Sequence, residues 1–447
     1  MWMLIAAVGC LAGLAAILLR FREIVDGPTR ALLLGLWLRY ALQAFPDYSI
    51  GIRVGPVSLL AAVSILTVVA LLLILDHRLL RLRALVPVYV LLAISLMSGL
   101  INRAPMGIAT DFTKWSFFIA VMLLSHRAMT LYGSDRAMRA LLATLVTPAF
   151  MMMASVVFNN PKSGELDGSI SYIGGYVHES MFSTLMYAVF ALCSLVRWRS
   201  GATLALAVCF GAVAVVLANY RSTVISLLPA LTAFMALVYL KNVQPRFAAA
   251  AIVSLAILVI GALPFAFNSL PERYAEITDV AHNLHIMMKE PLELTAAERL
   301  IFSGRIRIWL EYIHSFTNGT YVNYIIGFGP NLHERYFRLV AHNTFISALW
   351  EYGYLGFIAT IYMSIYYVLI PLKINDTYDR YILSSLLLGI VVNGLAAMPL
   401  WTVEGLILYG QLVAYAVWRA DGNPRPGAAT PQTSAQRIGS GTRLGST

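Results

Sequence analysis

Long apolar runs recur along almost the whole chain and constrain its fold more than any other sequence feature. All but one measure about 17 to 28 residues, which as helix is long enough to cross a hydrocarbon layer of roughly 30 Å. Only 12% of the side chains are charged, 59% are hydrophobic and the mean hydropathy is +0.75. Such a chain has too little polar surface for a water-soluble globule. The sequence therefore predicts an all-α polytopic membrane protein, and it excludes a secreted globule, a nucleic-acid-binding protein and a disordered regulator.

Thirteen of the runs are candidate transmembrane helices. They lie near residues 1–19, 31–45, 57–75, 84–101, 115–131, 137–158, 180–196, 202–218, 222–240, 247–267, 344–371, 381–398 and 402–418. The run at 31–45 is short and carries Arg39, so it is either a half-span or part of a bent helix. We therefore expect about 12 spans. The first run lacks a basic n-region and an A-x-A site, and we interpret it as a retained helix rather than a cleaved signal.

Lysine and arginine are distributed unequally between the predicted connections. Alternate connections, from 20–30 to 372–380, hold fifteen of them, and the intervening short connections hold six. The positive-inside rule places the richer set, together with the tail after Trp418, in the cytoplasm. The net charge of +10 is thus explained by loops that face anionic headgroups. Alternation puts the long segment 268–343 on the opposite, extracytoplasmic side.

The runs and connections divide the chain into four parts. They are N-terminal transmembrane helices at 1–267, a long outer loop at 268–343, C-terminal transmembrane helices at 344–418 and a tail at 419–447. Only the outer loop is a connection long enough to fold by itself, so we expect the chemistry there. The tail is rich in Gly, Pro, Ser and Thr and is expected to be disordered. The three cysteines lie inside apolar runs and give neither a disulfide framework nor a CxxC metal site.

The outer loop concentrates titratable groups, with seven basic residues, eight acidic residues and five of the eight histidines. Thr295 and Glu298 have the spacing of a capping box. A helical period follows in the apolar residues Phe302, Ile306, Trp309, Ile313 and Phe316, which predicts an amphipathic helix lying against the bilayer or the bundle. Arg307 and Glu311 are four apart on one flank of that helix, and we interpret them as a solvated pair.

Three groups from distant parts of the chain converge on the outer boundary. Arg221 lies in a turn too short for anything but a tight connection, where it is either a functional group or an interfacial arginine that snorkels. Arg305 belongs to the amphipathic helix. His342 stands where the loop re-enters the membrane, and a neutral imidazole there can accept a proton near neutral pH. Asn343 is equally well the N-cap of the helix that follows.

Two guanidinium groups and an imidazole at a lipid–water boundary suit a membrane-bound diphosphate. The planar fork of arginine matches phosphate oxygens and stabilises the charge that grows as a sugar–phosphate bond breaks. ATP is absent outside the cytoplasm, so a lipid-linked diphosphate sugar is a natural activated donor there. The acceptor hydroxyl then needs a general base, and His342 is the candidate.

Several short patterns, in order over about 170–360, resemble the O-antigen ligase and polymerase superfamily of bacterial envelope glycan assembly. They are Gly-Gly-Tyr-Val-His-Glu at 174–179, Tyr-Arg-Ser-Thr at 220–223, Ser-Gly-Arg with a following Trp at 303–309, Gly-Phe-Gly-Pro at 327–330, Ala-His-Asn-Thr-Phe at 341–345 and Glu-Tyr-Gly-Tyr-Leu-Gly at 351–356. The resemblance implies a type-C glycosyltransferase fold that moves glycan from undecaprenyl diphosphate in the outer leaflet to an acceptor. In that family, arginines matching Arg221 and Arg305 and a histidine matching His342 are the functional positions.

Further substrate-binding candidates are expected near the same face. They are His333, Arg338, Asn343, Glu404, His178 and Tyr220, although His178 and the neighbouring Glu179 could equally be helix-start residues. The family's ligases are described as metal-independent, so no metal or other cofactor is expected. The one closely spaced outer carboxylate pair, Glu165 and Asp167, is interpreted as solvated.

Among the activities of this superfamily, the short loop at 159–179, with Lys162 as its single basic residue, favours a ligase over a polymerase. A protein O-oligosaccharyltransferase would carry an extra outer domain, which is also less consistent with this chain. We expect a monomer in the bacterial inner membrane, with lipid A–core as acceptor, membrane lipids around it and inversion at the anomeric carbon. A transporter of lipid-linked sugars is the competing class, and it predicts inverted repeats, interrupted helices and ionisable residues at mid-membrane depth. A loop that only binds a partner is the third alternative.

Overall fold

The computed structural model describes residues 1–422 apart from residues 56, 164–169, 241–285, 287–288 and 297. Four of the described helices or joined helices are long and apolar enough to cross a membrane: Trp2–Arg20, Arg83–Ile101, Pro105–Tyr132 and Thr344–Lys373. A bent pair, Ser134–Thr144 and Val146–Val157, makes a fifth if it is one span, and four shorter apolar helices accompany them. The number twelve therefore stays a prediction. The expected span at 247–267, the pair Glu165 and Asp167, and the tail beyond 422 lie outside the described residues.

The first half of the chain forms helices joined by short turns and two small hairpins. Its helices are α1 (Trp2–Arg20), α2 (Gly27–Gln43), α3 (Pro46–Ser49), α4 (Leu59–Leu73), α5 (Val86–Ile101), α6 (Pro105–Tyr132), α7 (Ser134–Thr144), α8 (Val146–Val157), α9 (Glu179–Leu195), α10 (Gly201–Leu217) and α11 (Arg221–Leu240), with 3₁₀ turns η1 (His77–Arg81) and η2 (Arg83–Leu85). The antiparallel hairpins pair β1 (Arg53–Val54) with β2 (Val57–Ser58), and β3 (Lys162–Ser163) with β4 (Ile170–Ser171).

The second half combines short loop helices with three long helices. These elements are η5 (Glu298–Gly304), α14 (Arg305–Thr317), α15 (Tyr321–Ile326), α16 (His333–Tyr336), α17 (Thr344–Leu369), η6 (Ile370–Lys373), α18 (Thr377–Gly394), η7 (Pro399–Trp401) and α19 (Val403–Ala420). Helices thus dominate the described chain, as the sequence predicted.

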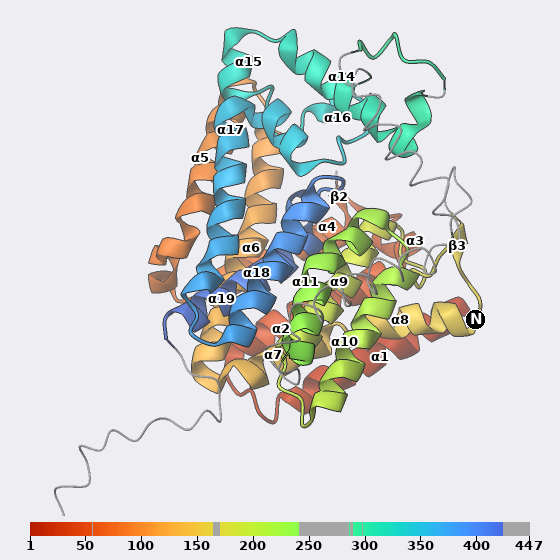
Figure 1. The fold of residues 1–447 in the computed structure, drawn as a ribbon, viewed down its shortest axis with the longest axis vertical. Helices are drawn as coiled ribbons and strands as arrows, with labels where there is room; N and C mark the ends of the chain where they lie inside the picture. Colours follow the sequence, from red (N-terminus) through yellow and green to blue (C-terminus); the bar gives the residue numbers. More distant parts are fainter. Residues whose placement is uncertain (56, 164–169, 241–285, 287–288, 297, 423–447) are drawn as a thin grey trace, which may run out of the picture.

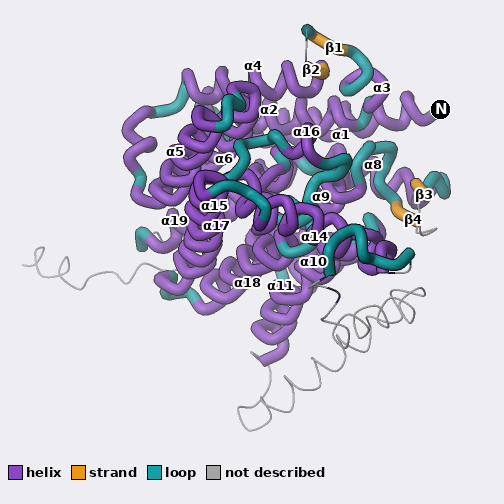
Figure 2. Tube along the Cα trace, turned by 90° about the horizontal axis from the view of Figure 1, so that it is seen from above, coloured by secondary structure: helices purple, strands orange, loops and turns teal. Residues whose placement is uncertain are grey.

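The long helices pack into one bundle, and the loop helices cover one end of it. Figure 1 shows α14, α15 and α16 gathered past the ends of the bundle helices, and Figure 2 shows the same elements from above. Within the bundle α6 packs against α19, α11 against α18, α9 against α10 and α5 against α17. Helix α19 is buried along almost its entire length, from Glu404 to Arg419, so it forms the centre of the bundle.

The structure changes the form of two predicted spans. The run at 137–158 is not one straight helix, because α7 and α8 meet at an angle of 47°. The doubtful run at 31–45 belongs to an unbroken helix, α2, which begins earlier, at Gly27. Asp26 caps α2 by accepting a hydrogen bond from the Thr29 amide, and a proline at the first turn fits there because its missing N–H needs no partner.

Helix α17 is interrupted at Gly353, whose φ is 65° and ψ −162°. Beside this break, the carbonyl oxygens of Trp350 and Glu351 accept hydrogen bonds from the amides of Phe328 (2.9 Å) and Gly329 (3.0 Å). The Gly-Phe-Gly-Pro motif thus supplies backbone donors to an interrupted helix, which satisfies groups that would otherwise be costly to bury. These bonds fasten the outer loop to α17.

The amphipathic helix exists, but it buries two faces rather than one. Tyr312 and Phe316 pack with Trp350 in one apolar cluster. Ile306 and Leu310 pack in a second cluster with Leu294 and Ile286. The predicted single stripe was therefore wrong in part: Trp309 and Ile313 are only half-buried, because the helix lies between Trp350 of α17 and the loop residues Ile286 and Leu294 rather than on one flat surface.

Candidate functional site

The turn between α10 and α11 presents Tyr220 and Arg221 at the start of α11. Asn219 adopts a positive φ of 49°, a conformation that asparagine tolerates better than most residues. Its side-chain amide donates to the carbonyl of Ile170 at 2.9 Å, and the Tyr172 amide donates to the carbonyl of Leu217 at the same distance. The preceding loop therefore holds the turn in place. Arg221 is half-buried and makes contacts of its own, so the structure leaves open which of its two predicted roles applies.

Arg305 is the first residue of α14, and the turn before it depends on glycine. Gly304 has a φ of +80°, in the left-handed region where a side chain is strained, and it joins η5 to α14. The Arg305 guanidinium donates to the Tyr220 hydroxyl at 3.3 Å and lies 5.6 Å from the centre of its ring. A cation over the face of tyrosine is attracted by the ring quadrupole. The structure thus brings Arg305 against the residue that directly precedes Arg221.

His342 lies in the last turn before α17, with an unusual positive φ of 48°. The carbonyl of the preceding residue, Ala341, accepts a hydrogen bond of 2.9 Å from the Trp309 indole, one turn along α14 from Arg305. Non-glycine residues with positive φ occur where the surroundings hold them in place, and they cluster at functional sites. Helix α14 therefore positions both Arg305, at its start, and the backbone next to His342.

The electrostatics of His342 keep its imidazole neutral. Burial and, to a smaller extent, the positive charge of Arg305 together lower the pKa of His342 from its ordinary 6.5 to about 4. The ring is accordingly an unprotonated acceptor across the neutral pH range. A neutral imidazole can take a proton from a hydroxyl, whereas an imidazolium cannot.

Asn343 acts as the N-cap of α17. Its side-chain oxygen accepts from the amides of Phe345 (2.9 Å) and Ile346 (3.1 Å), and its nitrogen donates to the Leu395 carbonyl at 2.8 Å. All of these partners are backbone groups, and the side chain is 7% exposed. Asn343 therefore fixes where α17 begins and ties it to the end of α18, which holds the neighbouring His342 in register.

His333 is buried and faces α17. Its Nδ1 lies 3.4 Å from the Glu351 Oε1, and the other Glu351 oxygen accepts from the Asn331 amide at 3.1 Å. The pair belongs to the same contact region as the Gly-Phe-Gly-Pro motif. This geometry gives His333 a role in fastening the loop to α17, while its predicted role in substrate binding stays a prediction.

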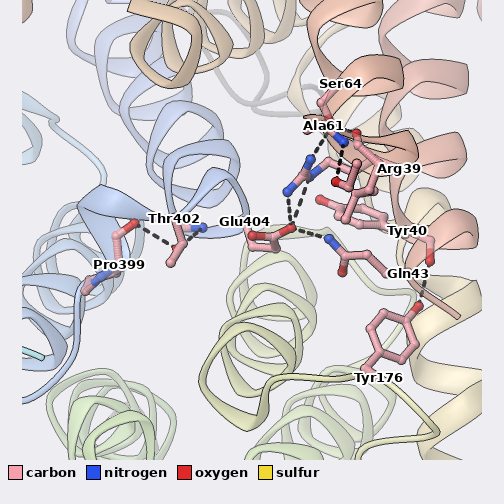
Figure 3. A network of polar contacts seen from close by, with 12 residues as sticks. Arg39, Tyr40, Gln43, Ala61, Ser64, Tyr176, Pro399, Thr402 and Glu404 are labelled. Atoms are coloured by element: carbon pink, nitrogen blue, oxygen red, sulfur yellow. Dashed lines mark hydrogen bonds and ion pairs between the residues drawn. The ribbon is translucent and has the colours of Figure 1, made fainter. Parts of the chain in front are cut away.

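Glu404 lies at the centre of a buried polar network (Figure 3). Its Oε1 accepts from the Arg39 guanidinium at 2.5 and 3.0 Å and from the Gln43 amide, and Arg39 also donates to Ser64. Glu404 is 1% exposed and Arg39 7%. Arg39, which made the run at 31–45 doubtful, is therefore compatible with a helix because a carboxylate from α19 neutralises it.

The two remaining candidates lie at exposed positions. His178 is exposed at the N-cap position of α9 and makes no capping hydrogen bond. Arg338 is exposed on the outer loop and lines a separate pocket. Among the described residues, no group of three or more His, Cys, Asp or Glu side chains is arranged to hold a metal ion.

A second buried network was missed by the sequence analysis. The carboxylate of Asp111, 3% exposed in α6, accepts hydrogen bonds from Ser95 (2.7 Å) and Tyr352 (2.5 Å). Nothing local marks Asp111, because its partners come from α5 and α17. The only signal was a charged residue next to the predicted span at 115–131, which in fact begins at Pro105. Ionisable residues inside helices are thus more numerous than the sequence suggested, but the described ones found here are hydrogen-bonded.

The apolar helical bundle defines an integral membrane protein. At one end of the bundle a folded loop brings arginine, tyrosine and a neutral histidine to one candidate site. Residues 204–361, about a third of the chain, match the family model described as O-antigen ligase, and this match supports membership of the O-antigen ligase superfamily. No curated protein matches the sequence.

The matched region runs from α10 into α17. It contains Tyr220, Arg221, Arg305 and His342, whereas His178 and Glu404 lie outside it. The match supports a function of the O-antigen ligase or polymerase type, a glycosyltransferase-like activity on lipid-linked glycans in a membrane. It does not distinguish between the activities within the superfamily.

Proposed function

We propose that the protein is an O-antigen ligase that transfers glycan from undecaprenyl diphosphate to lipid A–core on the periplasmic face of the bacterial inner membrane. The observation that carries the proposal is the position of Arg305, which contacts Tyr220 and whose charge helps to keep His342 neutral, because it supports a pairing of a cation for the diphosphate with a neutral base. Transfer to an acceptor hydroxyl needs both groups.

In the proposed reaction, Arg305 and Arg221 hold the diphosphate. The acceptor oxygen attacks the anomeric carbon while the bond from that carbon to the phosphate oxygen breaks, so the configuration inverts. The hydroxyl proton passes to His342, and the undecaprenyl diphosphate leaves with the electron pair of the broken bond. Negative charge grows on the leaving oxygen, where guanidinium groups stabilise it.

Donor binding should also change the pKa of His342. In the protein by itself, burial and the Arg305 charge hold the pKa of His342 near 4, which makes it a weak base. A diphosphate beside Arg305 would bring opposite charge, which favours protonated His342 and raises its pKa. We therefore expect His342 to become a stronger base when the donor binds.

The test is a transfer assay with purified protein in liposomes, undecaprenyl-diphosphate glycan, lipid A–core, excess EDTA and no nucleotide. A mobility shift of lipid A–core supports the ligase, and we expect His342→Ala and Arg305→Ala to abolish the shift while the proteins stay folded. Arg335→Ala, which removes an exposed arginine of α16, is the matched control and should retain transfer. Full activity in either site variant would remove that residue from the mechanism.

The alternatives give different outcomes in the same assay. Lengthening of donor glycan without lipid A–core would indicate a polymerase. Transfer to a protein instead would indicate a protein O-oligosaccharyltransferase. If folded protein forms no product with any acceptor but moves lipid-linked glycan between leaflets, the transporter replaces the ligase. The break at Gly353 is the feature that keeps this class in consideration, because transporters use interrupted helices.

A further inference from the structure

A pocket of about 620 Å³ opens in the outer loop, apart from the His342 site. Its walls come from α14, from the segment around Tyr336 to Leu339, and from the chain around Glu290 to Leu292. Its volume falls within the range of pockets that hold small molecules. The loop helices that contribute to its walls lie past the ends of the bundle helices (Figure 1).

Arginine outnumbers the acidic residues in this pocket, with Arg299, Arg307 and Arg338 against Glu290 and Glu311. Arg299 and Arg338 are exposed, and neither makes an ion pair with any residue that the structure describes. Arg299 donates from Nε to the Leu294 carbonyl at 3.0 Å, which fixes the side chain and leaves the terminal nitrogens available. The third arginine, Arg307, is paired with Glu311 at 3.0 Å. Two guanidinium groups thus face the pocket without a carboxylate partner.

Aromatic rings form another part of the wall. Phe337 is stacked on Tyr312 with ring centres 4.0 Å apart, so it is held rigidly, whereas Tyr336 is 59% exposed. Both line the pocket. An exposed tyrosine ring offers an apolar face with a polar edge, and arginine offers paired donors for phosphate or carboxylate oxygens. This combination suits a sugar that carries a negative charge.

The pocket is connected to the His342 site by two elements that serve both. Helix α14 begins with Arg305 in the site and lines the pocket with Arg307 and Glu311, which lie roughly 3 to 9 Å further along the helix axis. Leu339 lies at the pocket wall, three residues before His342 in the chain. Its carbonyl accepts a hydrogen bond of 3.2 Å from the Tyr312 hydroxyl of α14. One extended oligosaccharide could therefore occupy the pocket while a more distant sugar reaches His342.

We infer that this pocket binds an anionic saccharide, phosphorylated or carboxylated, and holds the charged inner part of the acceptor glycan during transfer. The inference rests on the proposed function for the identity of the acceptor, but binding itself needs neither donor nor turnover. Arg299 and Arg338 contact the anionic group, and Tyr336 stacks on a sugar ring. Glu290 and Glu311 also line the pocket, and their negative charges disfavour a ligand with densely spaced anionic groups.

The inference is tested by binding without donor. The probe is lipid-free phosphorylated core oligosaccharide, compared with the same oligosaccharide after phosphatase treatment, titrated calorimetrically into the full-length protein in detergent. We expect the phosphorylated form to bind at least tenfold more tightly, and added salt to weaken it. In the double variant Arg299→Gln/Arg338→Gln this preference should disappear. The control Arg335→Gln removes one exposed arginine outside the pocket and should keep it.

The outcomes separate the inference from the proposed function. Equal binding of both oligosaccharides, or an unchanged preference in the double variant, overturns the inference. If phosphatidylglycerol vesicles compete with the oligosaccharide through the same two arginines, the phosphate belongs to a membrane lipid and the saccharide assignment is overturned. Retained binding preference in a protein that transfers no glycan would leave the inference standing while the ligase function fails.

Discussion

The Arg305 guanidinium and the Tyr220 hydroxyl are 3.3 Å apart, although 85 residues separate them in the chain. Their contact joins the start of α14 to the start of α11, so a residue of the outer loop and a residue of the bundle form one site. Because Arg221 directly follows Tyr220, the same contact brings the two predicted phosphate-binding arginines to neighbouring positions. The site therefore depends on how the loop sits on the bundle.

Tyr220→Phe removes the hydroxyl acceptor but keeps the ring beneath the Arg305 cation. A hydrogen bond to a charged group contributes about 1.5 to 3 kcal/mol when partly desolvated, but Arg305 here is half-buried and can bond water instead. We expect transfer to fall about fivefold in Tyr220→Phe, corresponding to about 1 kcal/mol. Tyr220→Ala loses the ring as well and should fall at least a further fivefold. Equal rates for both variants would show that Tyr220 does not position Arg305.

The pKa of His342 can be measured directly by NMR on protein with labelled histidine, using His342→Gln to assign the signal. We expect a midpoint near pH 4 in the donor-free protein. Arg305→Gln should raise this midpoint, because a positive charge next to the ring is removed, but burial should keep it below 6.5. Arg307→Gln, which removes a guanidinium paired with Glu311, should leave it unchanged.

The lowered pKa of His342 also makes the stability of the folded protein depend on pH. A histidine whose folded-state pKa is lowered takes up a proton in the unfolded chain at a higher pH than in the folded protein. The contribution of His342 to stability is therefore constant above about 6.5 and falls as pH decreases from 6.5 towards 4. His342→Gln should reduce this acid sensitivity in a thermal unfolding series between these pH values. A larger acid sensitivity in the variant would contradict the direction of the shift.

Glu404→Gln leaves the buried Arg39 charge without its carboxylate. Removing one partner of a buried ion pair typically costs about 3 to 5 kcal/mol. We expect a clear fall in thermal stability, and partial recovery in the double variant Arg39→Met/Glu404→Gln, in which no buried charge remains. The rate of glycan transfer per molecule of folded protein distinguishes a structural role of Glu404 from a role in substrate binding. A stable Glu404→Gln protein without transfer would support the predicted substrate role.

Gly353→Ala tests the interrupted helix. A Cβ at this position would lie 2.5 Å from the Ile325 carbonyl carbon and 2.6 Å from the Gly327 nitrogen, on a backbone with a φ of +65°. Backbone atoms cannot move aside cheaply, so we expect a loss of about 2 to 4 kcal/mol or failure to fold. Gly201→Ala, where a Cβ meets nothing within 4 Å, is the control and should be neutral. Unchanged stability of Gly353→Ala would mean that the loop can detach from α17 without cost.

Features that depend on neighbours along one helix could be read from the sequence. Thr295 and Glu298 form the reciprocal capping box, with hydrogen bonds of 2.8 and 3.3 Å, and a contact with Lys289 lowers the pKa of Glu298 to about 2. Arg307 and Glu311 form the predicted pair. The positions of the long helices also follow the apolar runs closely, as α17 and α19 show. The helical period fixes these relationships within three or four residues, so no knowledge of the tertiary structure is needed.

Relationships between distant segments were decided only when the helices packed. The sequence marked Arg39 as an anomaly and Glu404 as a substrate candidate, and their contact across 365 residues explains both. The sequence predicted His342 as a base. Its pKa, however, is set by burial and by the Arg305 charge, and both depend on how the loop packs. By itself the sequence determined a helical membrane protein and the residue types of its site. The tertiary structure decided which groups meet and which charges are neutralised, because burial and Coulomb interactions depend on distances in space that no local period encodes.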